Sequence, residues 1–319
     1  MSNKIATLLK ERQPYRVDGV PSELHPLPPF VAKADWTVLG DAIQQAECPN
    51  VAAIPGDKWI SLRCDGNGFS KLTKRLQKDG VFSSGYSSEF AAIMHACCRE
   101  LMTTFSARCG YTQSDELTVL LAPAPVVRSE QHPHLYNGRL QKLCSLAAAT
   151  VTSRFHYELM ALCLNEKLDA KSVLLSTQAT FDCRVGMYDS ELEALSLVFW
   201  RAYDCGVNAI SDATYKSGIP EGKHMTGKSN GERLVWLAKH NLLPQHPHQR
   251  DGTFLVKRNR LEKGINQQTG QPVTYFRRRI ENEEGNVLQL YKEGALLPRD
   301  DVTQQKFGGQ LQRQLHSQK

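Results

Sequence analysis

The sequence contains no apolar run that approaches the length needed to cross a membrane. Its first 16 residues also lack the long apolar stretch of a secretory signal. They carry four basic residues against one acidic residue, so mitochondrial targeting is the alternative to the cytoplasmic location that we expect. No internal repeat with a period of about 20–50 residues and no low-complexity segment is present, which excludes a repeat architecture.

The nine cysteines include no Cys-x-x-Cys pair. An odd number of cysteines without that motif argues against both a disulfide framework and a zinc ribbon. Cys97 and Cys98 lie within an apolar helical pattern and are predicted to be buried thiols. These features fit a reducing compartment.

The positive charge is concentrated near the C-terminal end. Residues 250–319 hold 13 Lys/Arg and 8 Asp/Glu, and so carry nearly all of the formal net charge of +6. Arg277, Arg278 and Arg279 follow Tyr275 and Phe276. Because basic residues beside stackable rings suit an RNA backbone and its bases, these three arginines are candidate RNA-binding residues. The alternative is a solvated hairpin face whose arginines bind nothing specific.

The hydrophobic pattern predicts an α+β fold in three regions. These are an N-terminal extension over residues 1–57, a catalytic region over 58–250 and a basic C-terminal region over 251–319. Alternating residues predict strands over 58–65, 109–112, 117–123 and 179–188, with a C-terminal hairpin over 253–281. Apolar residues at three- and four-residue spacing predict helices that start near residue 70 and cover 87–108, 140–164, 191–211 and the segment before 242.

Two short acidic stretches are candidates for one site. Asp65 and Gly66 end the first predicted strand, and Ser114, Asp115 and Glu116 occupy a predicted hairpin turn. If the strand lies beside the hairpin, the carboxylates of Asp65 and Asp115 project at one edge of the sheet. Two such acids with the Gly66 carbonyl suit Mg²⁺, and two Mg²⁺ ions can clamp a phosphoryl or nucleotidyl transfer. The alternative for each stretch alone is an ordinary turn, with Glu116 as a support or a solvated neighbour.

The stretches "RCDGNGFSKL" and "YTQSDEL" resemble the tRNA-His guanylyltransferase family and its Thg1-like relatives, which are 3′-to-5′ nucleotide polymerases. The resemblance is clear over residues 59–121 and weaker over about 200 residues. It implies a palm of the polymerase and cyclase type, that is, an antiparallel sheet with flanking helices, extended by further helices and a basic hairpin. It also implies a homo-oligomer, either a dimer or a tetramer.

The resemblance carries functional residues onto this sequence. It implies Asp65, Gly66 and Asp115 as ligands of two Mg²⁺ ions, with ATP and GTP as substrates and the 5′ end of a tRNA as the partner. The nucleotide-binding residues would be the following: Asp65, Gly66, Asn67, Gly68, Phe69, Ser70, Ser114, Asp115 and Lys142. In this reaction ATP activates a 5′-monophosphorylated RNA, and the 3′-hydroxyl of an incoming nucleotide then expels AMP. A 5′-triphosphate end can skip the activation.

The sequence departs from the family pattern at three places. Asn67 stands where the family has arginine, no KPxDxR stretch follows the first helix, and Gly206 stands where the eukaryotic enzymes have a histidine. The glycine at position 206 argues against dedicated tRNA-His guanylylation and favours the Thg1-like branch, which adds nucleotides templated by the opposite strand and can repair truncated 5′ ends. Two other hypotheses stay open from the residues alone: a nucleotide cyclase with the same palm, and a non-catalytic RNA-binding module.

Two His-Pro-His stretches, His132–His134 and His246–His248, raise the question of a transition-metal site. Both lie in proline-broken segments without nearby cysteine ligands. We therefore expect solvated loops at both places. Phe199 and Trp200 are expected in the core rather than as stacking platforms.

Overall fold

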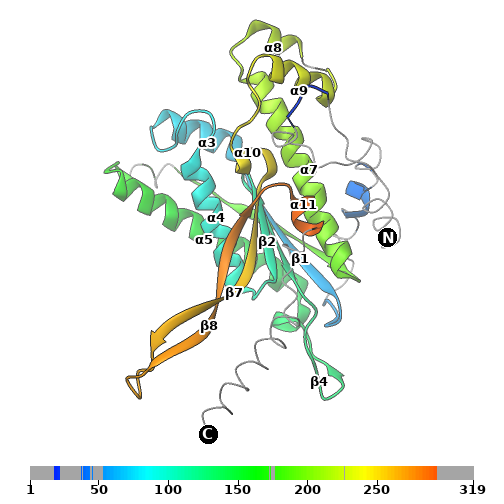
Figure 1. Cartoon of the computed structure of the whole chain (residues 1–319), viewed down its shortest axis with the longest axis vertical. Coiled ribbons are helices and arrows are strands. Elements are labelled where there is room, and N and C mark those ends of the chain that lie inside the picture. Colours follow the sequence, from blue (N-terminus) through cyan, green and yellow to red (C-terminus); the bar gives the residue numbers. More distant parts are fainter. Residues whose placement is uncertain are drawn as a thin grey trace.

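The computed structural model describes residues 53–292 apart from 172, 174–176 and 226, together with residues 18–21, 37, 39–43 and 45. A six-stranded antiparallel sheet in the order β6-β1-β3-β2-β7-β8 forms its centre (Figure 1). The strands are β1 (Trp59–Gly66), β2 (Cys109–Gln113), β3 (Glu116–Leu121), β6 (Phe181–Tyr188), β7 (Thr253–Ile265) and β8 (Pro272–Glu284). The predicted class, a mixed fold with an antiparallel sheet and helices, is confirmed.

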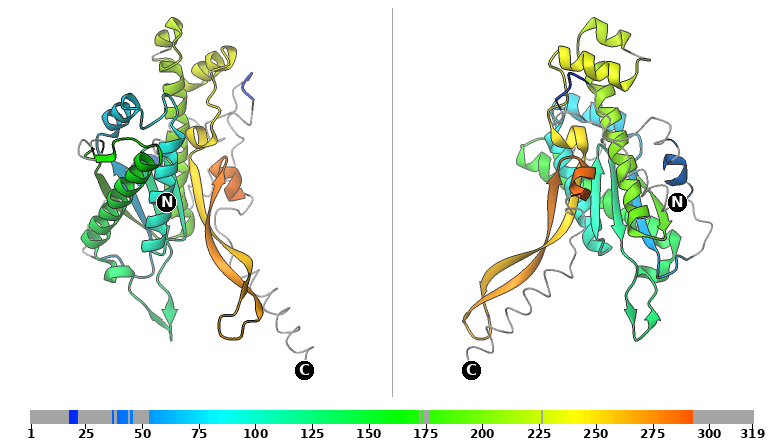
Figure 2. Two further views of the ribbon diagram at one scale, coloured as in Figure 1. Left: turned by 90° about the vertical axis from the view of Figure 1, so that its left-hand side faces the viewer. Right: turned by 45° about the vertical axis from the view of Figure 1, so that its right-hand side comes forward.

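Helices cover both faces of the sheet. Helices α4 (Ser88–Thr104) and α5 (Leu140–Asn165) pack on one face, and α7 (Glu191–Tyr215) packs on the other (Figure 2). The alternation in β1 follows from this layering. Ile60, Leu62 and Cys64 join the cluster under α4 and α5, whereas Trp59 joins the cluster under α7.

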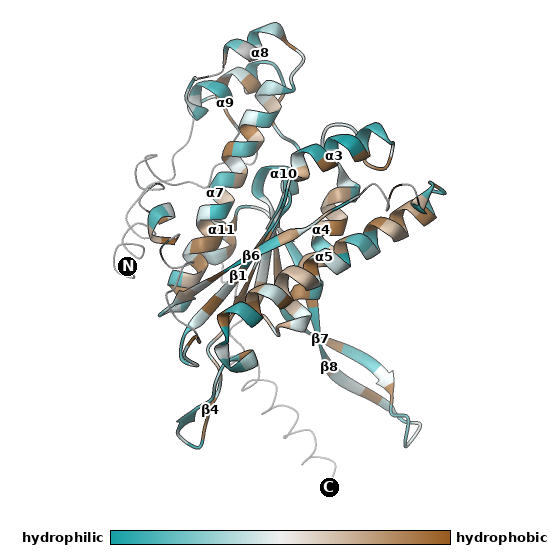
Figure 3. Ribbon diagram, turned by 180° about the vertical axis from the view of Figure 1, so that it is seen from behind, coloured by the Kyte–Doolittle hydropathy of each residue, from teal (hydrophilic) through white to brown (hydrophobic). Residues whose placement is uncertain are grey.

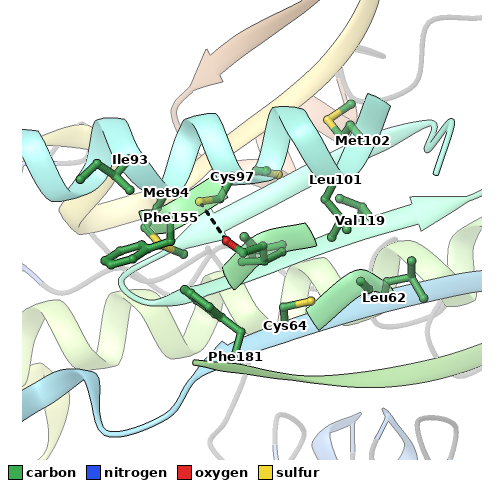
Figure 4. Close-up of a cluster of buried hydrophobic side chains, with 14 of the residues drawn as sticks. Leu62, Cys64, Ile93, Met94, Cys97, Leu101, Met102, Val119, Phe155 and Phe181 are labelled. Atoms are coloured by element: carbon green, nitrogen blue, oxygen red, sulfur yellow. Dashed lines mark hydrogen bonds between the residues drawn. The ribbon is translucent and has the colours of Figure 1, made fainter. Parts of the chain in front are cut away.

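The main core lies between the sheet and the pair α4 and α5. Cys97 and Cys98 are fully buried there, as predicted. The Cys97 thiol donates to the backbone carbonyl of Val151 at 3.8 Å (Figure 4). Burial raises the pKa of both thiols, so they remain protonated and unreactive near neutral pH.

Helix α4 ends earlier than its hydrophobic pattern predicted. The expected end was Arg108, but the last helical residue is Thr104. Ser106 adopts a positive φ of 53°, and the Ala107 N–H bonds back to the Met102 carbonyl. This tight turn closes the helix and redirects the chain into β2.

Several shorter elements complete the fold. Helix α3 (Phe69–Lys78) is largely hydrophilic and buries only Phe69 and Leu76 (Figure 3). Helix α9 (Asn230–Lys239) begins at a capping box, in which the Ser229 and Glu232 side chains each accept from the other residue's backbone N–H. The remaining short elements are α8 (Pro220–His224), α10 (Pro247–Asp251), α11 (Val287–Lys292), η2 (Leu135–Gly138), β4 (Val126–Val127) and β5 (Glu130–Gln131). Among the helices described, none has the length and apolar composition of a membrane span.

Both His-Pro-His stretches differ from the solvated loops that we expected. Residues 247–251 form helix α10, because a proline at the first helical turn is tolerated there. His248 is 7% exposed and His134 is 5% exposed. His134 Nε2 donates to the Lys58 carbonyl at 2.7 Å. Each stretch therefore places one imidazole inside the protein.

Strands β7 and β8 form a long antiparallel pair that projects from the body of the molecule (Figures 1 and 2). The first residues of β7 pair with β2, from Thr253 opposite Thr112 to Val256 opposite Cys109. The predicted boundary between the catalytic region and the basic C-terminal region, at residue 250, therefore lies just before β7, which is a strand of the central sheet.

Candidate active site

The two acidic stretches meet at one edge of the sheet. In the β1–β3 register Asp65 lies opposite Glu116, and the Gly66 N–H donates to the Asp115 carbonyl at 3.2 Å. Asp115 follows Ser114 in the tight turn between β2 and β3. Because β1 and the β2–β3 hairpin are neighbours, the carboxylates of Asp65 and Asp115 come together as the sequence predicted.

The turn after Asp65 leads directly into helix α3. Gly68 precedes the helix with φ of 70°, a left-handed conformation that glycine adopts without strain. The backbone N–H of Asn67 donates to the Thr180 carbonyl at 2.9 Å, which fixes the turn against the start of β6. Asn67, Gly68 and Ser70 are exposed, so the start of α3 is open to a ligand.

Phe69 has a different role from the other residues of this turn. Its ring is 2% exposed and packs on Phe155 and Phe181, with ring centroids 5.2 Å and 4.8 Å away. A Cβ on Gly66 would lie 2.3 Å from this ring, so only glycine fits beside it. The Phe69 side chain thus anchors the turn in the core, and only its backbone N–H remains to meet a nucleotide.

Ser114 orients the second acid. Its φ of 47° is uncommon for a residue other than glycine and belongs to the hairpin turn. Its Oγ donates to Asp115 Oδ1 at 3.0 Å. This hydrogen bond holds one oxygen of the Asp115 carboxylate in place.

Glu116 is a buried support and not a solvated neighbour. It is 5% exposed, and its two carboxylate oxygens pair with Arg63 at 3.2 Å and Arg201 at 2.6 Å. Both guanidinium groups also lie over the ring of Trp200, at 5.8 Å and 4.7 Å from its centroid. This cluster joins β1, β3 and α7 directly beneath the acids, a link that the sequence analysis missed.

The site concentrates negative charge. Partial burial and then the charges of Glu116, Asp115 and Asp182 raise the pKa of Asp65 to about 6. Burial also raises the pKa of Asp115, although hydrogen bonds from its own backbone N–H and from the Ser114 hydroxyl act in the opposite direction. Asp182 lies opposite Asp65 in the β1–β6 register. Its buried Oδ1 accepts no hydrogen bond from the residues that the structure describes, and Arg184 Nε lies 4.0 Å from it. A bound cation would relieve this crowding of carboxylates.

The donor set fits Mg²⁺ better than a transition metal. Within the part of the chain that the structure describes, no three His, Cys, Asp or Glu side chains form a metal-binding group. Mg²⁺ needs only one or two carboxylates, because waters and substrate phosphates complete its shell. Asp65 and Asp115 supply two carboxylates, whereas the buried imidazoles offer no third ligand for Zn²⁺.

A cavity of about 1000 Å³ opens beside the acids. Asp65, Ser70, Ser114 and Asp115 line one end of it, and α3, α4, α7, α8, α9 and α10 supply its other walls. Its basic lining residues beyond the Glu116 cluster are Lys74, Lys216 and Arg233. Lys74 lies in α3, Lys216 directly follows α7 and Arg233 lies in α9, so no shared sequence motif pointed to them.

Two predicted groups do not lie at this cavity. Lys142 is near the start of α5, 13 residues before the Phe155 that contacts Phe69. At 1.5 Å per residue this is about 20 Å along the helix. The Lys142 Nζ instead lies over the Tyr136 ring, 4.9 Å from its centroid. Lys142 is not among the residues that line this cavity, so the geometry lends no support to the expectation that it binds the triphosphate. Arg277, Arg278 and Arg279 lie on the projecting strand β8.

A histidine pair, half-buried His95 and buried His248, lies beside the cavity, which His248 lines. His95 Nε2 and His248 Nδ1 are 3.2 Å apart, and His248 Nδ1 is also 2.8 Å from the Thr253 hydroxyl. Burial, and then the charge of Arg99, lowers the pKa of His95 to about 4. Burial, and then His95, lowers the pKa of His248 to about 3. Both imidazoles are therefore neutral in the folded protein at pH 7.

We expect this pair to make the fold sensitive to mild acid. Each pKa lies below its ordinary value of 6.5, so the unfolded chain takes up protons that the folded protein does not. The contribution of the neutral histidines to the stability of the fold is fully present above pH 6.5, and it is lost as the pH falls towards 4. The urea midpoint of the wild type should drop between pH 7.5 and pH 5, and the drop should be smaller in His95→Gln. Exposed His132→Gln is the control, and equal drops in all three proteins would contradict the assignment.

The comparisons with known proteins agree with this geometry. The family model described as "Thg1: tRNAHis guanylyltransferase" matches residues 41–189. An uncharacterized protein of Acanthamoeba polyphaga mimivirus is 29% identical over 214 residues, which are 64% of this chain and 70% of that protein. The tRNA(His) guanylyltransferase of Debaryomyces hansenii is 26% identical over 180 residues, which are 56% of this chain and 61% of that enzyme. The match thus spans less than two thirds of the yeast enzyme.

Solved structures show the same fold. A bacterial tRNA(His) guanylyltransferase (Thg1)-like protein in complex with ATP has a TM-score of 0.54 and 21% identity. That match covers 81% of this chain and 99% of the bacterial chain. The same kind of bacterial protein in complex with GTP gives a TM-score of 0.51 and 22% identity, with coverage of 81% and 96%.

The matched proteins include tRNA-His guanylyltransferases, which are nucleotidyltransferases, and this chain is similar to them. The chain thus resembles the Thg1 family, as the sequence had predicted from residues 59–121, and the family model covers slightly less than half of it.

Proposed function

We propose that the protein is a Mg²⁺-dependent 3′-to-5′ nucleotidyltransferase that extends the 5′ end of a tRNA or a tRNA-like RNA. The observation that carries this proposal is the meeting of Asp65 and Asp115 at the mouth of a cavity of about 1000 Å³. Two carboxylates with raised pKa values need a cation there, and a nucleoside triphosphate brings phosphates that share it.

The sheet order supports a palm of the polymerase type. Strands β1, β3 and β2 are consecutive and antiparallel, with one acid at the end of β1 and the other in the β2–β3 turn. Helices α4 and α5 cover one face of these strands. The arrangement leaves the acids at an edge, where a nucleotide and an RNA end can approach from outside the sheet.

Each residue of the site has a task in this proposal. Asp65 and Asp115 hold Mg²⁺ with the help of the Gly66 carbonyl, and Ser114 orients Asp115. The ion, when bound, supplies Lewis-acid stabilisation of charge on the transferring phosphate. The turn at Gly68 and the start of α3 at Phe69 and Ser70 offer backbone N–H groups to the phosphates. Lys74, Lys216 and Arg233 supply positive charge along the cavity.

The proposed reaction has two steps. An oxygen of the RNA 5′-monophosphate attacks the α-phosphorus of ATP, and pyrophosphate leaves. The 3′-hydroxyl of the incoming nucleotide, often GTP, then attacks the RNA 5′-phosphorus, loses its proton, and expels AMP. The new phosphodiester bond leaves a 5′-triphosphate on the extended RNA, so a further addition needs no ATP.

A product assay separates this function from the two alternatives. tRNA transcripts with a ³²P-labelled 5′-monophosphate are incubated with ATP, GTP and Mg²⁺. We expect a labelled RNA that is one or more nucleotides longer. A cyclic nucleotide would instead identify a palm-type cyclase, and tRNA binding without any product would identify a non-catalytic RNA-binding module.

We further propose that the opposite RNA strand selects the added nucleotide. Gly206 is buried in α7, at the position where the family's eukaryotic enzymes have a histidine. A glycine offers no side-chain hydrogen bond for reading a base, so base pairing must supply the discrimination.

We therefore expect templated repair to be faster than untemplated guanylylation. A tRNA that lacks its first guanosine opposite C72 should react faster than full-length tRNA-His under single-turnover conditions. The same truncated tRNA with A72 is the control, and it should lose GTP addition. Faster reaction of full-length tRNA-His would overturn the templated branch of the proposal.

A further inference from the structure

Two aromatic rings from distant parts of the chain stack at the edge of the large cavity. Tyr86 lies in the loop between α3 and α4, and His246 lies directly before α10. Their ring centroids are 4.2 Å apart, and the angle between the ring planes is only 17°. Tyr86 lines the cavity, whereas His246 is exposed and is not among the described residues that line it. The stack therefore forms part of the rim of the cavity, with Tyr86 on the inner side.

The loop that carries Tyr86 is held in place on both sides of the ring. On one side, Gln77 Nε2 donates to the Gly85 carbonyl at 3.3 Å. On the other side, the Ser87 hydroxyl caps helix α4 by accepting the Phe90 N–H at 3.1 Å. The position of the Tyr86 ring is thus set by the backbone before any ligand arrives.

The second His-Pro-His stretch explains the position of His246. Pro247 restricts the residue before it to an extended conformation, and His246 has φ of −76° and ψ of 123°. The Arg250 N–H donates back to the His246 carbonyl at 3.1 Å. His248, by contrast, is 7% exposed, and its ring centroid lies 6.4 Å from that of Tyr86. The stretch therefore turns one imidazole into the protein and leaves the other on the rim.

The stack lies to one side of the acids, at the same end of the sheet as α3 (Figure 1). Asp65 lies at the end of β1, and α10 leads into β7 at Thr253, three strands away in the order β1-β3-β2-β7. Because neighbouring strands are about 4.8 Å apart, the start of β7 is about 14 Å from Asp65. A base that reaches the rim while a phosphate reacts at the acids therefore belongs to a nucleotide beside the reacting one.

The rim has the chemistry that unpaired nucleobases need. The stack covers one face of the exposed His246 ring and leaves the other to solvent, and bases of any sequence stack on such a face. Tyr215, the last residue of α7, also lines the cavity and is 77% exposed. Lys74 and Arg233 supply positive charge in the same cavity for the phosphates that join the bases. Open rings together with cations are the combination by which proteins hold single-stranded RNA.

We propose that Tyr86 and His246 form a stacking platform for an unpaired base of the RNA, next to the end that reacts. RNA as the source of the base rests on the proposed function, whereas the platform itself rests on the two stacked rings and their place on the rim. The base extends the stack on the open face of His246. Since that face lies outside the cavity lining, a polynucleotide that enters the cavity reaches it, and the platform holds the overhanging strand in one orientation.

The fluorescence of 2-aminopurine tests this stacking directly, because the base is quenched when it stacks on a ring. The probe is a hairpin RNA whose 3′ strand overhangs its 5′ end, with 2-aminopurine as the first overhanging base, and no nucleoside triphosphate is added. We expect the wild type to quench the probe, and His246→Ala to lose the quenching and to bind the RNA at least about fivefold more weakly. His246→Phe should restore both, because phenylalanine keeps a flat ring. The His246 side chain makes no capping hydrogen bond to α10, so neither change removes a cap.

His240→Ala is the matched control. His240 is also exposed, and its ring centroid lies 4.7 Å from that of Trp236, but it is not among the described residues that line the cavity. This variant should quench and bind the probe like the wild type. Equal effects of His246→Ala and His240→Ala, full quenching by His246→Ala, or no quenching by the wild type would each overturn the platform.

Two further readouts separate this inference from its alternatives. The affinity for ATP alone should be the same in His246→Ala and the wild type, and a loss would show that the stack holds the base of a free nucleotide instead. If the wild type extends RNA while His246→Ala quenches the probe normally, only the platform fails. If the wild type quenches the probe through His246 but adds no nucleotide to any RNA, only the catalytic proposal fails.

Discussion

We expect the Asp65→Asn variant to lose nucleotide addition by on the order of a thousandfold, while it unfolds at the same or a higher urea concentration than the wild type. Asparagine keeps the size of the side chain and one oxygen, but it lacks the charge that holds Mg²⁺ against the triphosphate. The gain in stability follows from the same crowding of charge that makes the site functional.

The sign of the stability change depends on pH. The pKa of Asp65 is raised to about 6 in the fold from an ordinary value of 3.8, so its ionised form destabilises the folded protein. This loss of folding free energy is absent below pH 3.8, where Asp65 is protonated in both states, and is fully present above pH 6. At pH 8 the variant should exceed the wild type by about 1–2 kcal/mol, since the half-buried carboxylate is partly screened by water. The excess should shrink as the pH falls.

The control for this prediction is Asp189→Asn. Asp189 is an exposed acid that pairs with Lys58 at 2.8 Å, far from the cavity. Its replacement should leave both activity and stability nearly unchanged. A catalytically competent Asp65→Asn enzyme would remove Asp65 from the site. A variant that is both inactive and strongly destabilised would give Asp65 a structural role instead.

The second large effect is expected from Glu116→Gln. Glutamine has the same shape as glutamate, but it leaves the buried guanidinium groups of Arg63 and Arg201 without their negative partner. Breaking such a buried pair from one side costs about 3–5 kcal/mol. We expect a loss of this size in the free energy of unfolding measured with urea, and a weaker anchor for the turn that carries Asp115.

Glu262→Gln is the matched control. Glu262 also pairs with two arginines, Arg277 and Arg279, but it lies on the exposed β7–β8 pair. Exposed ion pairs contribute about 0–1 kcal/mol, so this variant should unfold almost like the wild type. If Glu116→Gln and Glu262→Gln destabilise the protein equally, the cluster of Glu116, Arg63 and Arg201 is not the support that we infer.

The parts of the site that the sequence predicted are those with local signals. Asp65 ends an alternating strand, and Asp115 lies in a turn between two short strands, so neighbouring residues alone locate each acid. The order strand, helix, helix, hairpin then suggested that the two acids meet. The same local patterns predicted most helices and strands, because hydrophobic spacing reports burial directly.

The parts that the sequence did not reveal depend on contacts between distant residues. Glu116 pairs with Arg63 and Arg201, which are 53 and 85 residues away, and no spacing rule connects them. The segment of helix α10 was expected to be a loop because it contains prolines. The burial of His248 there depends on its contact with the distant His95, which no local pattern indicates.

The projecting strands illustrate the same limit. Arg277, Arg278 and Arg279 are adjacent in the sequence, but the β7–β8 register lets only Arg277 and Arg279 pair with Glu262. The alternation of side chains along a strand places Arg278 on the opposite face from its two neighbours, and this could have been predicted from the sequence. The face on which acidic residues pair with the arginines could not be predicted, because it depends on the register of the partner strand.

Metal binding in the presence of a nucleotide tests the central claim most directly, because it needs no RNA and no turnover. Mn²⁺ is titrated by electron paramagnetic resonance into the protein with a non-hydrolysable ATP analogue, for the wild type, Asp65→Asn, Asp115→Asn and Asp189→Asn. We expect the wild type and Asp189→Asn to bind Mn²⁺ together with the nucleotide, and both site variants to lose at least about tenfold in affinity. Unchanged Mn²⁺ affinity in Asp65→Asn and Asp115→Asn would contradict the claim that these two carboxylates form the metal and nucleotide site.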